Sequence, residues 1–224
     1  LLTGMPIGGP HWQNLFWILA VLSMTIGNLM ALRQSEVKRM LAFSSIAHAG
    51  YVMVAIVVGS KSAISGLIFY SFAYGVMGTG AFGILSIRYA GRNPQTYDDL
   101  AGYGKRNPLL AIMMTLFMFS LIGLPLTGGF IGKLQIFSAA LDGGWIWLTL
   151  IGILNSALSA YYYLRVVMFM YMREEAMPEG IDLSRRSSGF ALTGIIGTAI
   201  AVLYLGVFPD KIMELASSSI QSLL

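Results

Sequence analysis

Long runs of apolar residues, separated by short polar segments, dominate the chain. A helix that crosses the hydrocarbon core of a bilayer needs about 20 consecutive apolar residues. Runs of about this length lie at residues 12–32, 40–58, 63–87, 109–141, 145–171 and 188–208. The runs are continuous rather than alternating, which argues against the strand pattern of a membrane barrel. The chain is therefore predicted to be all-α, a polytopic transmembrane helix bundle.

The fourth run is interrupted within "LPLTGGFIGKLQIF", residues 124–137. Pro125 lacks a backbone donor and clashes with the preceding turn, and Thr127, Gly128 and Gly129 are expected to let the chain unwind there. Unwound backbone at membrane depth occurs only where it is buried in protein or lines a hydrated cavity, and transporters place such breaks beside ions. We predict a broken helix around Pro125–Gly129. An ordinary proline kink is the alternative.

Lys133 is the one charged residue in the middle of any run. A lysine at the centre of a membrane helix costs about 2.5–3.5 kcal/mol on insertion scales, so it is tolerated only where it faces protein or water. Its stem could instead reach the membrane surface. However, eight residues separate it from the polar Asp142, roughly 12 Å of helix, which is too far for the stem. The position favours a functional lysine.

Two other polar patterns interrupt the apolar runs. Ser44, His48 and Tyr51 share one face of the second run, and histidine relays protons readily because its ordinary pKa lies near physiological pH. A hydrogen-bonded packing histidine explains the same pattern. In the fifth run Asn155, Ser159 and Tyr162 recur at helical spacing. Such a stripe holds water in a channel or, more often, joins helices together.

Composition supports a membrane protein. Of the 224 residues, 56% are hydrophobic and 11% are charged, whereas soluble domains carry about 25% charged residues. There are no cysteines, which excludes disulfides and thiolate metal sites in this chain. We find no acidic residue inside a run, no phosphate-binding glycine loop and no His/Cys cluster. The chain is therefore expected to hold no nucleotide, haem or iron–sulfur centre.

The basic residues predict an orientation. Eleven of the 14 Lys and Arg residues lie in, or just before, the segments after the first, third and fifth runs, whereas Lys61 and Lys211 lie on the other side. By the positive-inside rule these three segments face the cytoplasm and both ends of the chain face outward. After Pro209 the tail is expected to form a short amphipathic helix at the outer surface, or else to fray.

Three blocks together resemble a known family. They are "ALRQSEVKRMLAFSSIAHAGY", "LFMFSLIGLPLTGGFIGKLQIF" and "GILNSALSAYYYLRVVMFMY". They are similar to the antiporter-like membrane subunits of respiratory complex I, and "GFIGK" after "GLP" favours the subunit N (subunit 2) group of bacterial NADH:quinone oxidoreductases. The resemblance implies that Lys133 matches the lysine of the second broken helix, near the outer end of a proton route. His48 then matches a position that connects this lysine to the central relay.

The same resemblance implies the setting. Such a subunit has about fourteen helices, of which this chain matches the last six, in keeping with a first residue, Leu1, that is not Met. It would translocate protons in the bacterial inner membrane beside sibling antiporter-like subunits. Partner subunits would carry out electron transport from NADH to quinone with flavin and iron–sulfur clusters. Two alternatives remain: a subunit of a multisubunit cation/proton antiporter, and a scaffold segment that pumps nothing.

Overall fold

The computed structural model describes residues 10–87, 96–174 and 189–221. In chain order these residues form α1 (Pro10–Leu32), α2 (Val37–Val58), α3 (Lys61–Ser86), the 3-10 turn η2 (Asp98–Leu100), α4 (Tyr103–Arg106), α5 (Pro108–Ile122), α6 (Gly128–Asp142), α7 (Ile146–Met172), α8 (Gly189–Val207) and α9 (Asp210–Gln221). The only strand-like pairing among them is an isolated bridge between Glu36 and Thr96. The prediction of an all-α membrane bundle is confirmed.

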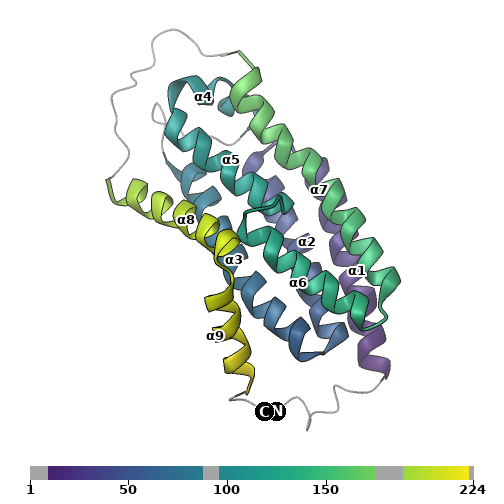
Figure 1. Ribbon diagram of the computed structural model, residues 1–224. Helices are drawn as coiled ribbons and strands as arrows, with labels where there is room; N and C mark the ends of the chain where they lie inside the picture. Colours follow the sequence, from purple (N-terminus) through teal and green to yellow (C-terminus); the bar gives the residue numbers. More distant parts are fainter. Residues whose placement is uncertain (1–9, 88–95, 175–188, 222–224) are drawn as a thin grey trace.

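Five of the described helices are long and apolar enough to cross a membrane alone: α1, α2, α3, α7 and α8. Helices α5 and α6 have 15 residues each, about 22 Å at helical rise, so neither reaches across a core of about 30 Å. In Figure 1, α6 continues in the same general direction as α5 after a short break. The short segment Asp98–Arg106 bends away from α5 by 119°. The predicted run 109–141 thus corresponds to two half-helices.

The break itself covers residues 123–127. Gly123 ends α5 in the left-handed region at φ 91°, and its N–H and that of Leu124 bond back to the last turn. Leu126 also has a positive φ of 69°, which is a strained conformation for a residue with a branched side chain. Thr127 closes the break, because its hydroxyl donates to Leu124 O at 2.7 Å and its backbone starts α6. Pro125 lies inside the break, as predicted.

Gly128 and Gly129 do not unwind the chain, contrary to our expectation; they are the first residues of α6. Their small size serves close packing. A Cβ on Gly129 would lie 1.9 Å from the carbonyl oxygen of Ser120, and the Gly129 N–H donates to the Ser120 hydroxyl at 3.2 Å. The start of α6 is thereby held against the last turns of α5. The glycine that turns the chain is Gly123.

The helices pack around a core that contains several aromatic hydroxyls. Helix α1 packs along α2, α3 contacts α2, α5, α6 and α8, and α7 contacts α1, α5 and α6. The largest fully buried side chains are four tyrosines, namely Tyr51, Tyr70, Tyr162 and Tyr163. Their rings fill the middle of the bundle as apolar side chains would, but each also brings a hydroxyl that needs a partner. The centre of this bundle therefore contains buried hydroxyl groups among its apolar side chains.

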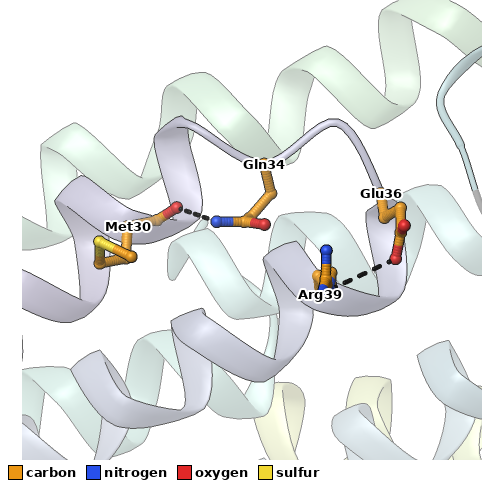
Figure 2. A network of polar contacts seen from close by, with 4 residues as sticks. All are labelled: Met30, Gln34, Glu36 and Arg39. Atoms are coloured by element: carbon orange, nitrogen blue, oxygen red, sulfur yellow. Dashed lines mark hydrogen bonds and ion pairs between the residues drawn. The ribbon is translucent and has the colours of Figure 1, made fainter.

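A tight connection sets how α2 follows α1. Figure 2 shows Gln34 donating to the carbonyl of Met30 at 3.0 Å and Arg39 paired with Glu36 at 3.6 Å. Both contacts lie at the surface and between residues close in sequence, so each contributes little to stability. They lie at the turn that brings α2 back beside α1.

The end of α8, just before α9 begins, packs against the break between α5 and α6. Gly206, near the end of α8, lies so close to Leu126 and Thr127 that a Cβ would sit 2.2 Å from the Leu126 oxygen. Helix α9 then runs beside α3 (Figure 1), and its Ile212 and Met213 pack against a small cluster formed by Phe69, Ala73 and Leu205. The tail is helical, as one of our two expectations held. This helix contacts α3.

Several basic residues used for the predicted orientation, Arg88, Arg92, Arg185 and Arg186, lie outside the described residues.

Candidate proton-transfer site

Lys133 is buried inside the bundle, with 5% of its surface exposed. Its ammonium donates to the carbonyl oxygens of Leu121 at 2.9 Å and Ile122 at 3.0 Å, and to the Ser156 hydroxyl at 2.9 Å. All three of its donors are therefore used. The side chain turns inward and does not reach the membrane surface.

The two carbonyls belong to the last turn of α5, whose groups have no partner within the helix. The break frees them, and the negative end of the helix dipole attracts the cation. Gly123 makes room for this arrangement, since a Cβ there would lie 3.2 Å from Lys133 Cδ. No carboxylate among the described residues bonds to the amine. The cation is thus held by dipoles and not by a counter-charge.

His48 occupies a second buried cluster. Its Nδ1 bonds to the hydroxyl of Tyr70 on α3, and its Nε2 bonds to the hydroxyl of Tyr163 on α7 at 2.9 Å. A neutral imidazole has one N–H and one acceptor nitrogen, so one tyrosine donates and the other accepts. This chain of three groups has hydrogen bonds through which a proton can pass. A groove of about 350 Å³ between α1, α2 and α3 reaches His48 from the side of the bundle.

Tyr51 lies between the two clusters. The ammonium of Lys133 is 5.0 Å from the centre of its ring, a distance suited to a cation–π contact. The His48 ring meets the same ring edge-on, with centroids 5.5 Å apart. The structure therefore brings together three of the predicted residues, Lys133, His48 and Tyr51, from α6 and α2.

The polar stripe of α7 mainly joins helices. Asn28 on α1 donates to both oxygens of Asn155, the backbone one at 3.0 Å and the side-chain one at 3.1 Å, and accepts from Tyr162 at 2.7 Å. Ser44 and Ser159 donate to carbonyls of their own helices, at Leu41 and Ser156. Our interpretation of this stripe as a channel lining has no direct support from these bonds.

Sequence reasoning left out four members of the site: Asn28, Ser156 and the two tyrosines that bond to His48, Tyr70 and Tyr163. Asn28 is an isolated amide in an apolar run, and that isolation was the available signal because an intramembrane polar group needs a partner. Ser156 lies next to the predicted α7 stripe in the sequence but was not part of it. Its pairing with Lys133 depends on how α7 packs against the break and has no signature in the sequence.

The comparisons with known proteins were consistent with one another. Residues 1–159 match the family described as NADH:quinone oxidoreductase/Mrp antiporter, TM. The chain belongs to this family. Subunit N of the NADH-quinone oxidoreductase of Trichlorobacter lovleyi is 45% identical over 222 residues, which are 99% of this chain and 45% of that protein. The chain thus spans about half the length of the curated relatives it matches.

Solved structures show the same fold. A chain of respiratory complex I from Thermus thermophilus superposes with a TM-score of 0.76 at 33% identity, covering 90% of this chain and 45% of that one. A chain of the Mrp complex from Dietzia sp. DQ12-45-1b gives 0.79 at 21% identity, covering 92% and 46%. At that identity the second likeness shows the fold alone. The matched family region contains His48, Tyr51, Lys133 and Ser156.

We predict that Asn28→Leu lowers the thermal unfolding midpoint of the full-length protein in detergent. The change leaves the hydroxyl of Tyr162 and the side-chain oxygen of Asn155 without their bonds to Asn28, at a cost of about 1–3 kcal/mol. Gln34→Ala is the matched control, since it removes a surface bond between two residues that are four apart in the sequence. Equal midpoints for the two variants would contradict the assignment of Asn28 as the link between α1 and α7.

Proposed function

We propose that this chain forms part of a proton-translocating membrane subunit of an NADH:quinone oxidoreductase, respiratory complex I. Protons would move through Lys133 and His48, driven by redox chemistry in partner subunits. The observation that carries the proposal is the ammonium of Lys133, which is buried at a helix break and held only by carbonyls and a hydroxyl. The choice of complex is supported by the 45% identity to subunit N of the Trichlorobacter lovleyi NADH-quinone oxidoreductase.

A site of this kind suits a proton carrier. A lysine paired with a carboxylate would keep its proton, because loss of the proton would leave a buried negative charge. Lys133 has no such partner among the described residues, so its amine can be charged or neutral without leaving a counter-ion behind. The surrounding dipoles favour the charged form, whereas burial favours the neutral one. A moderate change in the local field is then enough to move the proton.

The described geometry favours a route from His48 to Lys133. The Tyr70–His48–Tyr163 chain accepts a proton from the groove beside His48, and Lys133 takes it up across Tyr51. Release would proceed along α6 toward Asp142, the end that the charge pattern places outward. Nζ first releases its proton and becomes neutral, and it then takes up the next proton from the His48 side, so the lysine returns to its starting state in each cycle.

Partner subunits are required by this proposal. We expect no cofactor in this chain; flavin and iron–sulfur clusters would lie in partners that oxidise NADH and reduce quinone. Sibling antiporter-like subunits would lie beside it in the membrane arm. The family also includes Mrp antiporters, so a cation/proton antiporter is the second candidate. Co-purification of flavin and iron–sulfur proteins with the tagged full-length subunit favours complex I, and sodium-dependent proton exchange without them favours the antiporter.

We also propose the location and orientation. The protein is a multi-pass membrane protein, and we place it in the bacterial inner membrane. Basic segments such as the α1–α2 connection, with Arg33, Lys38 and Arg39, would face the cytoplasm, and both ends of this chain would face the periplasm. Lys61, at the start of α3, would lie on the periplasmic side.

Lys133→Ala should lower proton pumping by the assembled complex by about 100-fold, the scale of losing a proton-transfer group. Coupled quinone reduction should fall with it while the complex still assembles, because alanine leaves no buried charge behind. Lys133→Arg should keep only part of the activity. Arginine preserves the positive charge, but it holds its proton too firmly to release it readily. The measurement is proton uptake or release by inverted membrane vesicles, scaled to the amount of complex. Normal pumping by the alanine variant would rule out Lys133 as the carrier.

Single cysteines should report the orientation, because the printed sequence has none of its own. We expect Ser35→Cys, in the α1–α2 connection, to react with an impermeant maleimide only from the cytoplasmic side. Asp142→Cys, at the end of α6, should react only from the periplasmic side. Intact cells and inverted vesicles provide the two directions of access. The reverse pattern would overturn both the orientation and the outward direction of release.

A further inference from the structure

The Tyr51 hydroxyl is buried without a hydrogen-bond partner among the described residues. Tyr51 is 1% exposed, and its Oη makes no hydrogen bond of standard geometry among the described residues. The side chains of Asn28 and Ser156 lie close enough to interact with it weakly. A phenylalanine would fill the same space without burying a polar atom. An unsatisfied hydroxyl in the middle of a packed bundle calls for a specific explanation.

The hydrogen-bond donors around Lys133 give an explanation for the unpaired hydroxyl of Tyr51. The charged amine has three donors, and these meet Leu121 O, Ile122 O and Ser156 Oγ. The Ser156 hydroxyl in turn donates to Ile122 O at 3.2 Å. When Nζ loses its proton, the cluster has one donor fewer and gains one acceptor, the amine lone pair. The neutral cluster is then short of a donor, which the Tyr51 hydroxyl could supply.

We propose that Tyr51 is a positioning residue for the proton transfer of Lys133, whose hydroxyl becomes the replacement donor when the amine is neutral. The Ser156 hydroxyl turns to donate to Nζ, and Tyr51 Oη–H donates to Ser156 Oγ. No covalent bond other than the transferred N–H bond changes, and the proton leaves to the next group on the route. This inference rests on the proposed function of Lys133 and adds the group that makes its neutral form stable.

One side chain therefore serves both states of the lysine. The ring lies 5.0 Å from the ammonium and attracts it while it is charged. The hydroxyl completes the hydrogen bonds once the charge has left. In the charged state described here the Tyr51 hydroxyl is unpaired, which destabilises that state. In the neutral state the hydroxyl gains a hydrogen bond.

The other ionisable groups around Tyr51 and Lys133 are already engaged. His48 is bonded to Tyr70 and Tyr163, and Tyr162 to Asn28. From α5 the neighbours are backbone carbonyls, and α8 offers no hydrogen bond to the cluster among the described residues. These groups come from α2, α3 and α7, and Tyr74 of α3 stacks on the His48 ring with centroids 4.7 Å apart. Among the described residues the Ser156 hydroxyl bonds to Lys133 and Ile122, and none of these groups bonds to it.

Tyr51→Phe in the assembled complex tests the proposal, because it keeps the ring and removes only Oη. Without the replacement donor the neutral amine is disfavoured and proton release is slower. We expect pumping near pH 7 to fall about fivefold, as for one lost hydrogen bond. The pH at half-maximal activity should move to higher values, since a lower proton concentration compensates. A purely structural change would lower the rate without moving the pH profile.

Tyr97→Phe is the matched control. Tyr97 also has a buried hydroxyl with no hydrogen-bond partner, but it lies before η2, with its ring under Arg165 at 4.2 Å. Removing this hydroxyl should leave both the rate and the pH profile unchanged. Immunoblots of the membranes verify that each variant assembles to the same level.

A double variant identifies the acceptor. Once Ser156→Ala has removed the group that Tyr51 would serve, adding Tyr51→Phe should cause little further loss. The inference is overturned if Tyr51→Phe changes neither the pumping rate nor the pH profile. It is also overturned if Tyr51→Phe lowers pumping equally in the wild-type and Ser156→Ala backgrounds. Those results leave the proposed function standing if Lys133→Ala still abolishes pumping. If Lys133→Ala pumps normally, the proposed function itself fails.

Discussion

The contact between the Lys133 ammonium and the carboxyl end of α5 is the interaction on which the rest of this structure depends. A cation in the middle of an apolar bundle needs acceptors, and a continuous helix has none to give because its carbonyls are already bonded. Ending α5 at Gly123 frees the carbonyls of Leu121 and Ile122. The broken helix and the buried lysine are thus two parts of one solution. Either alone would be costly.

The break is stabilised from three directions. The Ser120 hydroxyl accepts from the N–H of Gly129, so the two half-helices are joined by a direct bond. Thr127 closes the turn on Leu124. On the far side, α8 approaches Leu126 so closely that only a glycine fits at 206. Such support explains how the strained backbone at Leu126 persists, since strain of this kind survives only where its surroundings fix it.

The tyrosines give the interior its particular character. Fully apolar side chains would pack as well, but they could not exchange protons or bond to His48. Tyr70 and Tyr163 hold both nitrogens of the imidazole, and Tyr162 closes on Asn28. Tyr51 contacts the lysine on one side and the histidine on the other. The bundle thereby keeps two protonatable centres close together, with no buried carboxylate between them among the described residues.

The sequence by itself determined that the chain is a helical membrane bundle, that its fourth apolar run is broken near Pro125, and that Lys133 and His48 are the residues to consider. Those conclusions follow from local properties: the length of apolar runs, the missing donor of proline and the cost of a charge in hydrocarbon. Tertiary structure alone decided that Gly123 rather than Gly128 and Gly129 turns the chain, since both positions offer the same conformational freedom and only packing against Ser120 distinguishes them. It also decided that Asn155 and Tyr162 bond to Asn28, whereas Ser156 bonds to Lys133. Neighbouring residues on one helix face different partners, and which partner each one meets depends on how α7 is rotated against α1, α5 and α6.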